Sequence, residues 1–240
     1  MSTLTLEQAT ATGMAIAYHA QEAPDNMAVI SNYGNRTFAE LNDRVNQLAR
    51  VLRAAGLKPD DGVAMLLTNR PEFVEVLYAC QRVGMRVTPI NWHLTGDNAS
   101  YIVENCEAKA FIADARCVQP AVDALNDNRN QVLLALSVGG DIEGFDDYAE
   151  VVGREAVDNI EDPEIGSQML YTSGTTGRPK GVFRPRLAPE VRPSETVTRA
   201  QSAAAWKPGQ DLCLCTGPAY HAAPLAFNIN GPLVEGVGTV

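Results

Sequence analysis

Short apolar runs alternate along the chain with segments whose apolar residues recur every three or four positions. The clearest of these segments begins at Thr37 and Glu40, which have the spacing of a helix-capping box, and it stops at Gly56. Its apolar stripe consists of Phe38, Leu41, Val45, Leu48 and Leu52. This period predicts an amphipathic helix, preceded by a hairpin whose first strand is near residues 28–30 and whose turn is at residues 32–35.

Strands and helices are predicted to alternate through the next eighty residues. The uninterrupted apolar run Val63–Leu67 is typical of a strand buried on both faces. Pro71 suits the first turn of a following helix, whose inward face we expect to be Phe73, Val76, Leu77 and Cys80. Further strands are expected near residues 87–90, 109–113 and 131–136, and further helices near 96–104 and 118–125. This alternation predicts an α/β fold with parallel sheets flanked by helices.

The second half of the chain is predicted to begin with an acidic connection. Residues 139–164 are polar and rich in Asp, Glu and Gly, and we expect a loop or weakly structured segment there. Beyond it we expect strands at 168–171, 181–183 and 211–216, and helices near 194–206 and 222–229. We therefore expect a first α/β subdomain at 1–138, a connection at 139–165, and the start of a second α/β subdomain at 166–240, truncated at its C-terminal end.

Composition narrows the function classes. With 19 Lys and Arg against 29 Asp and Glu, the formal charge of −10 argues against a nucleic-acid partner, but one local anion site remains compatible with it. No run approaches the roughly 20 apolar residues of a membrane helix, and the first residues lack the pattern of a secretory signal. The 5 cysteines include no C-x-x-C pair and are interpreted as reduced thiols, so we expect a cytoplasmic protein.

The segment Tyr-Thr-Ser-Gly-Thr-Thr-Gly-Arg-Pro-Lys-Gly at residues 171–181 carries the candidate chemistry. Its two internal glycines, Gly174 and Gly177, allow successive backbone amides to approach one anion closely. Four of the five residues from Thr172 to Thr176 carry a hydroxyl that adds a hydrogen-bond donor, and Lys180 adds a full positive charge. The spacing differs from that of the P-loop of nucleotide hydrolases. The pattern favours a cradle for the polyphosphate of a nucleotide over a flexible polar linker.

This segment closely resembles the most specific motif of the adenylate-forming enzymes, which include acyl-CoA synthetases, luciferases and peptide-synthetase adenylation domains. Residues 36–41, 88–91, 108–110 and 217–221 resemble further motifs of the family in the same order. Residues 91–97 and 220–224 are most similar to bacterial fatty-acid–CoA ligases. The likeness extends from about residue 14 to the end of the chain, so the fold it implies is the N-terminal part of the large domain of such an enzyme.

The resemblance implies a reaction and a set of site residues. Such enzymes join a carboxylic acid to ATP, with Mg²⁺, to form an acyl adenylate and pyrophosphate, and the CoA ligases then pass the acyl group to CoA. The residues implied to hold the ATP phosphates are Thr172, Ser173, Gly174, Thr175, Thr176, Gly177 and Lys180. Thr172 would also help to position Mg²⁺, while Tyr220 and His221 would lie at the acyl pocket.

Several motifs of the family are missing from these residues. They are the aromatic segment that covers adenine, the ribose-binding aspartate, the hinge and the catalytic lysine, so we expect no catalytic residue within this chain and no turnover by the chain alone. A non-catalytic phosphate-binding remnant or interaction module, and an adenylation domain that loads a carrier protein, stay open as alternatives. Acyl chain length and oligomeric state are not readable from the sequence.

Other residues that could suggest a site have simpler interpretations. Thr95 begins a Thr-Gly-Asp sequence but lies too early for the ribose motif, and we expect it to cap a helix. His93 is interpreted as a structural loop residue, and His19 carries no functional signal. Cys213 and Cys215 alternate with leucines, so we expect them to share the packed face of a strand and bind no metal.

Overall fold

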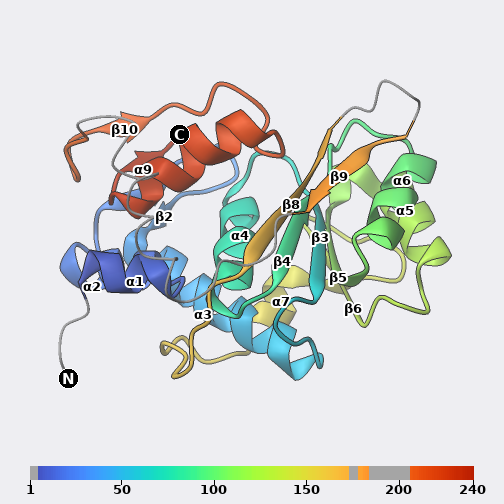
Figure 1. Ribbon diagram of the computed structural model, residues 1–240, viewed down its shortest axis with the longest axis horizontal. Helices are drawn as coiled ribbons and strands as arrows, with labels where there is room; N and C mark the ends of the chain where they lie inside the picture. Colours follow the sequence, from blue (N-terminus) through green and yellow to red (C-terminus); the bar gives the residue numbers. More distant parts are fainter. Residues whose placement is uncertain (1–4, 173–177, 184–205) are drawn as a thin grey trace.

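The computed structural model describes residues 5–172, 178–183 and 206–240, and their strands form two sheets (Figure 1). The larger sheet has seven strands in the order β7-β6-β5-β3-β4-β8-β9. In that order, their bounds are Asp146–Asp147, Leu134–Val138, Ala108–Asp114, Gly62–Leu66, Arg86–Pro89, Ser167–Thr172 and Lys180–Phe183. All neighbouring strands are parallel except β8 and β9, which form an antiparallel pair. The expected α/β class is confirmed.

Helices cover both faces of the large sheet. The covering helices are α3 (Phe38–Ala54), α4 (Pro71–Arg82), α5 (Gly96–Asn105), α6 (Val118–Asp127) and α7 (Tyr148–Gly153). Helix α2 (Ala15–Glu22) packs against α3 instead, and α1 (Leu6–Ala11) packs against α2. Helices α3, α4 and α7 share one core with one face of the sheet, and α5 and α6 share a second core with the other face (Figure 1).

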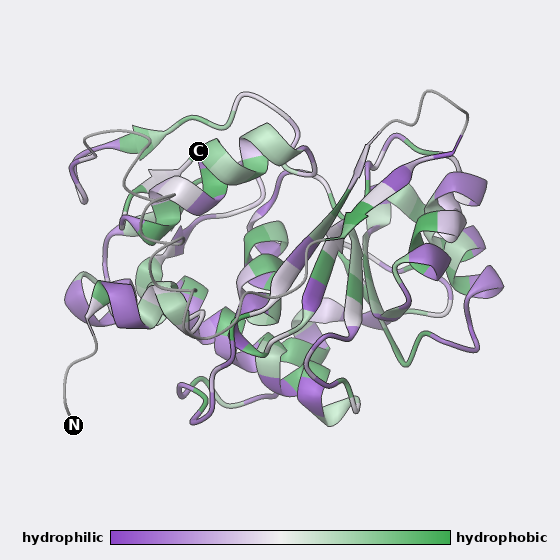
Figure 2. Cartoon of the chain, in the orientation of Figure 1, coloured by the Kyte–Doolittle hydropathy of each residue, from purple (hydrophilic) through white to green (hydrophobic). Residues whose placement is uncertain are grey.

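Strand β3 shows how the sequence produces these three layers. Its side chains alternate between the two cores: Val63 and Met65 join α3 and α4, whereas Ala64 and Leu66 join α5. Every residue of the strand is buried, as its unbroken apolar run predicted. Figure 2 shows hydrophobic residues concentrated on these central strands and on the helix surfaces that adjoin them.

Helix α3 forms where the capping pattern predicted it. The Thr37 hydroxyl accepts a hydrogen bond from the Glu40 amide, and the Glu40 carboxylate accepts one from the Thr37 amide. Its apolar stripe, which comprises Phe38, Leu41, Val45, Leu48 and Leu52, is completely buried. Each of these side chains contributes about 1.5–3 kcal/mol by leaving water. Gly56, just past the helix, has φ of +91°, a conformation that favours glycine.

The smaller sheet joins the two ends of the described chain. Its four strands lie in the order β10-β11-β1-β2, with bounds Leu212–Cys213, Gly238–Thr239, Met27–Val29 and Arg36–Thr37. Strands β1 and β2 are antiparallel, which confirms the predicted hairpin, and β1 is parallel to β11. Nearby, the His19 Nε2–H donates to the carbonyl oxygen of Val234 at 2.8 Å. Helix α2 is therefore fixed against α9 (Gly231–Val234).

The acidic connection is more ordered than we expected. Within residues 139–164 the chain adds strand β7 to the sheet edge and then forms helix α7. The helix is stabilised by tertiary contacts, because its first residue, Tyr148, is buried and donates its hydroxyl hydrogen to Glu75 at 2.8 Å. Val152 is buried as well. The expectation of a loop or weakly structured segment is therefore wrong for this part of the connection.

Other boundaries also differ from the expectations. Strand β6 begins at Leu134, after a turn, rather than at Gln131. Strand β10 is limited to Leu212–Cys213 instead of residues 211–216. The last helix does not end at Ile229: a π-helix at Pro224–Asn230 continues directly into α9. The helix expected near 194–206 falls outside the described residues except for Trp206.

No helix in the described part of the chain is both long enough and apolar enough to cross a membrane.

Candidate functional site

The candidate phosphate-binding segment is held at its two ends by the β8–β9 hairpin. Strand β8 pairs with β4 through Ser167 and Gln168 and then pairs with β9 from Met169 onward. In this register Thr172 lies opposite Lys180, and the Thr172 hydroxyl donates to the Lys180 carbonyl oxygen at 3.4 Å. Both residues are exposed. The hairpin therefore brings the first hydroxyl and the lysine of the segment together.

The centre of the segment lies outside the described residues. Ser173, Gly174, Thr175, Thr176 and Gly177 belong to this part. Their predicted contacts to phosphate stay predictions, as does the role of Thr172 and Lys180.

Helix α5 supports the hairpin from one side. The Tyr171 hydroxyl donates to Asn105 Oδ1 at 2.6 Å, and burial raises the pKa of this phenol. The guanidinium carbon of Arg178 lies 5.0 Å from the centre of the Tyr101 ring, within the range of a cation–π contact. Tyr171 and Arg178, on either side of residues 172–177, thus both contact α5. Sequence patterns do not predict these contacts, because α5 lies more than sixty residues earlier in the chain.

The glycine after the lysine leaves room for a tyrosine side chain. Gly181 is the register partner of Tyr171, and a Cβ atom at Gly181 would lie 3.0 Å from the Tyr171 ring and 2.3 Å from the methyl carbon of Met169. A larger residue would displace the ring that bonds Asn105. Steric hindrance by Tyr171 and Met169 therefore explains why a glycine follows Lys180 in this hairpin.

Tyr220 and His221 lie together just before the last helical segment. Their ring centres are 4.5 Å apart, at an interplanar angle of 47°. Tyr220 is half-buried, which raises the pKa of its hydroxyl, whereas His221 is exposed. The helix that follows opens with a π-helix, a form that recurs at functional sites. The assignment of both residues to an acyl pocket stays a prediction.

A third group of polar residues lies where strands β3 and β5 end. The Thr68 hydroxyl donates to Asp114 at 2.6 Å, and the Arg70 guanidinium lies 3.1 Å from the same carboxylate oxygen. Burial alone would raise the pKa of Asp114, but the hydrogen bonds from Thr68 and the Arg116 amide, together with Arg70, outweigh it and hold the pKa below its usual value. The carboxylate is therefore an ionised anchor for both neighbours.

Asn69, between these two anchored residues, was missed by the sequence analysis. Its side-chain amide donates to the Gly217 carbonyl oxygen at 3.0 Å and accepts from the Ala219 amide at 2.9 Å. It thereby links the end of β3 to the segment that carries Tyr220 and His221. An asparagine before Arg-Pro at a strand end is ordinary turn chemistry, so only the three-dimensional structure reveals this contact.

The described residues do not make a metal centre of their own. No group of three or more His, Cys, Asp or Glu side chains within them could hold an ion. Protein-bound Mg²⁺ normally takes one or two carboxylates together with substrate phosphates and water, whereas Thr172 offers one hydroxyl oxygen. The described donor set thus does not fit a complete Mg²⁺ site, and we derive no step through the ion.

The other sequence candidates take structural positions. Cys213 is buried and Cys215 is half-buried, while Leu212 and Leu214 are exposed, so the expected alternation is confirmed. Thr95 is the N-cap residue of α5, but its hydroxyl accepts from the Asn98 side chain rather than from a helix amide. The His93 ring stacks on Trp92 with ring centres 3.5 Å apart.

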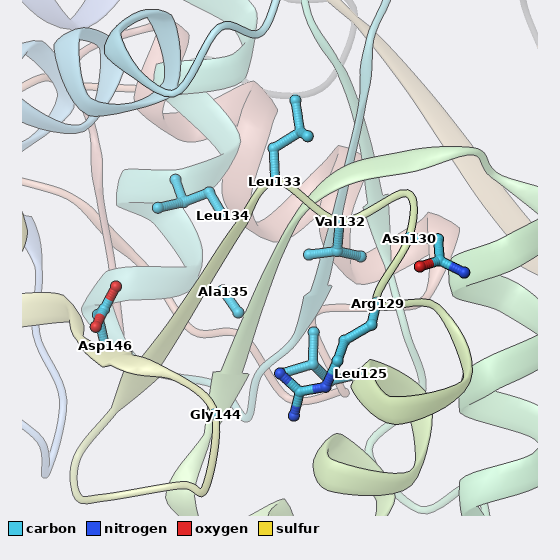
Figure 3. A pocket seen from close by; sticks show the side chains of 9 residues that line it. All are labelled: Leu125, Arg129, Asn130, Val132, Leu133, Leu134, Ala135, Gly144 and Asp146. Atoms are coloured by element: carbon cyan, nitrogen blue, oxygen red, sulfur yellow. The ribbon is translucent and has the colours of Figure 1, made fainter.

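A cavity of about 430 Å³ lies away from these groups (Figure 3). Its lining includes Leu134 and Ala135, the first residues of β6. It therefore lies near the amino end of that strand, whereas Thr68 and Asp114 lie at the carboxyl ends of the parallel strands β3 and β5. None of the predicted site residues that the structure describes, namely Thr172, Lys180, Tyr220 and His221, lines it.

Comparison with known proteins identifies the family. Residues 16–240 match the family described as AMP-binding enzyme. An indoleacetate–CoA ligase of Aromatoleum aromaticum is 29% identical over 92% of this chain and 43% of its own length. A fatty acid–[acyl-carrier-protein] ligase, ScoC, of Streptomyces coeruleorubidus is 28% identical over 87% of this chain and 39% of its own length.

The fold of this chain is also similar to that of a solved CoA ligase. The crystal structure of the anthranilate CoA ligase AuaEII with anthranoyl-AMP superimposes with a TM-score of 0.79 at 19% identity, over 94% of this chain and 44% of that one. This chain thus spans less than half the length of each of these three proteins. Because the family match includes both the β8–β9 hairpin and the Tyr220–His221 segment, the chain belongs to the AMP-binding enzyme family.

Proposed function

We propose that this chain supplies the ATP phosphate-binding segment and part of the acid-binding site of an ATP-dependent acid–thiol ligase. The observation that carries the proposal is the pairing of Thr172 with Lys180, which places a hydroxyl and a lysine at the two ends of the Gly/Ser/Thr-rich segment. Such a segment offers backbone amides and hydroxyls to the β- and γ-phosphates, and Lys180 offsets their charge.

The reaction proceeds in two displacements. A carboxylate oxygen of the acid attacks the α-phosphorus of ATP, the bond from that phosphorus to the bridging oxygen breaks, and pyrophosphate leaves with the electron pair. The sulfur of CoA then attacks the acyl carbon, and AMP leaves as the acyl–oxygen bond breaks. The acid needs no general base in the first step because it is ionised at neutral pH. Holding the leaving pyrophosphate is the contribution we assign to this chain.

A fatty acid is the acid we favour, since residues 91–97 and 220–224 resemble fatty-acid–CoA ligases, and we place the reaction in the cytoplasm. The five free cysteines support a reducing compartment. The relatives act on indoleacetate and on a fatty acid, and the structural neighbour on anthranilate, so aryl acids belong in the same test.

A carrier-protein thiol is the second candidate acceptor, favoured by the similarity to ScoC, whose name specifies that acceptor. The first displacement is the same in both cases. Acceptor choice is tested separately, by offering CoA and a phosphopantetheinylated carrier protein to the acyl adenylate.

The proposed function is tested on the purified chain with two measurements. Calorimetric titration should show that ATP binds and that inorganic tripolyphosphate competes with it, whereas AMP binds much more weakly. Pyrophosphate release from Mg-ATP with dodecanoate or benzoate should be absent, because the chain lacks the motifs for adenine and for the catalytic lysine. Equal binding of AMP and ATP would contradict the phosphate assignment. Clear turnover would show that the adenine motif and the catalytic lysine are not needed for formation of the acyl adenylate.

A further inference from the structure

Asn69 connects two parts of the chain that are about 150 residues apart in sequence. Its amide group binds two backbone atoms of one short segment: Nδ2 donates to the Gly217 carbonyl oxygen at 3.0 Å, and Oδ1 accepts from the Ala219 amide at 2.9 Å. This is the pattern that a neighbouring β-strand would offer to the same two residues. We propose that Asn69 is the positioning residue that fixes the Gly217–His221 segment, and with it Tyr220 and His221, at the acid-binding end of the site.

We call the two hydrogen bonds from Asn69 to Gly217 and Ala219 the Asn69 clamp, and the residues on either side of Asn69 are held rigidly. Thr68 and Arg70, the two sequence neighbours of Asn69, both bind the carboxylate of Asp114, at 2.6 Å and 3.1 Å. Both are also buried. Arg70 makes a second ion pair with Glu72 at 2.7 Å. Since its neighbours on either side are anchored to β5, the backbone of Asn69 has little freedom to move, and its side chain holds the opposing segment in a defined place.

The clamped segment is anchored at its centre. Ala219 is 1% exposed and belongs to the same core as helices α3 and α4. Its amide accordingly needs a partner within the protein, and Asn69 Oδ1 provides it. The next turn depends on this geometry, because the His221 amide donates to the Pro218 carbonyl oxygen at 3.0 Å and the Leu225 amide donates to the His221 carbonyl oxygen at 3.0 Å.

The consequence for binding rests on the proposed function. Tyr220 and His221 directly follow Ala219, the second residue that Asn69 binds, so a displacement of Ala219 moves both rings. The phosphate-binding hairpin is held independently, by Tyr171 and Arg178 against α5. Loss of the Asn69 amide should therefore weaken binding of the acid and leave binding of ATP unchanged. That separation distinguishes a positioning role from general destabilisation.

The test uses two substitutions and one control in the 240-residue chain. Asn69→Ala removes both hydrogen bonds. Asn69→Asp keeps the size of the side chain but presents an acceptor to the Gly217 carbonyl oxygen, so it should break the clamp even where the alanine variant folds poorly. Asn130→Ala is the matched control, since Asn130 is also an exposed asparagine but lies by the cavity near the amino end of β6.

Two readouts separate the inference from the proposed function. Amide hydrogen exchange at Ala219 and His221 should accelerate roughly 10-fold or more in both Asn69 variants, while Tyr171 and the α4 amides keep their rates. Unchanged exchange at Ala219 would overturn the inference, whether or not the protein is a ligase. Dodecanoate or benzoate affinity should fall roughly 10-fold in the variants and ATP affinity should stay within about twofold.

Each outcome of the affinity measurement has one meaning. If neither acid binds the unsubstituted chain while exchange accelerates in the variants, the positioning of the segment stands and the acid-binding role of the proposed function falls. If an acid binds and the Asn69 variants bind it as tightly as the Asn130→Ala chain, the assignment of Asn69 to the acid-binding end is overturned.

Discussion

Thr172 and Lys180 are register partners in the β8–β9 hairpin, and the Thr172 hydroxyl donates to the Lys180 carbonyl oxygen at 3.4 Å. The pairing leaves the Lys180 side chain exposed. The hairpin contact is made by the Lys180 backbone and not by its side chain, so the phosphate contact that we propose for the ammonium group is not needed to stabilise the fold. Binding and stability can therefore be separated at this residue.

Lys180→Ala should lower ATP affinity by about 10- to 100-fold, the effect of losing one hydrogen bond to a charged group. The midpoint of urea unfolding should not move, because the side chain is exposed. Calorimetric titration with ATP provides the measurement. Lys58→Ala, a change at another exposed lysine, is the control and should keep the affinity of the unsubstituted chain. Equal affinity in the Lys180 and Lys58 variants would remove Lys180 from the phosphate site.

Asp114→Asn should lower the free energy of unfolding by about 3 kcal/mol, because it leaves the buried Arg70 guanidinium without one of its two carboxylate partners. Urea unfolding of the chain at pH 7.5 measures this loss. Asp141→Asn, at an exposed carboxylate, should change the free energy by less than about 0.5 kcal/mol. An Asp114 variant as stable as the Asp141 variant would show that the Arg70 contact contributes nothing.

Sequence patterns predicted elements whose signals are local. The capping box at Thr37 and Glu40 and the buried run of β3 both fix their own structure within a few residues, and both predictions are confirmed. Helix α7 was missed for the opposite reason. It is only 6 residues long, and its order depends on the distant contact between Tyr148 and Glu75. A short helix in an acidic segment gives no periodic signal that could reveal such a contact.

For the candidate site as well, the sequence predicted the local motif but not the contacts from distant residues. The motif at residues 171–181 predicts a phosphate-binding segment because all of its candidate donors are consecutive in the sequence. The supporting contacts from Tyr101, Asn105 and Asn69 come from elements far away in the chain. No spacing rule relates these positions, so their roles follow from the packing of α5 and β3 against the site.

Gly166→Ala should destabilise the chain by about 1–3 kcal/mol through overpacking. A Cβ atom at Gly166 would lie 2.2 Å from the carbonyl oxygen of Met85 and 2.5 Å from that of Cys80, and neither backbone atom can move easily. Strand β8 begins at the next residue, so the strain should also displace the strand that carries Thr172. Urea unfolding and ATP titration measure the two effects.

The control for this substitution is Gly153→Ala. Gly153 ends helix α7, and outside that helix and the adjoining residues the nearest atom to an added Cβ belongs to Arg44 and is 4.0 Å away. Alanine there should be neutral or slightly stabilising, because it lowers the entropy of the unfolded chain without a clash. Equal stability of the two variants would contradict the close packing of β8 against the end of α4.

Stability should also fall as the pH drops, through His19. Burial of its ring lowers the pKa below the usual value, against smaller opposing effects from the Val234 carbonyl oxygen and Glu22. The unfolded chain therefore binds a proton more readily than the folded chain. The stability that His19 contributes is complete above about pH 6.5 and is lost as the pH falls from there through the folded-state pKa, by at most about 1.4 kcal/mol per pH unit.

The measurement is the free energy of unfolding in urea at pH 7.5, 6.5 and 5.5. His19→Gln retains a hydrogen-bond donor but does not titrate, so its stability should fall less steeply over this range than that of the unsubstituted chain. His93→Gln makes the same change at an exposed histidine and should keep the original slope. Since the His19 ring holds α2 against α9, a parallel slope in the His19 variant would mean that protonation does not disturb this contact.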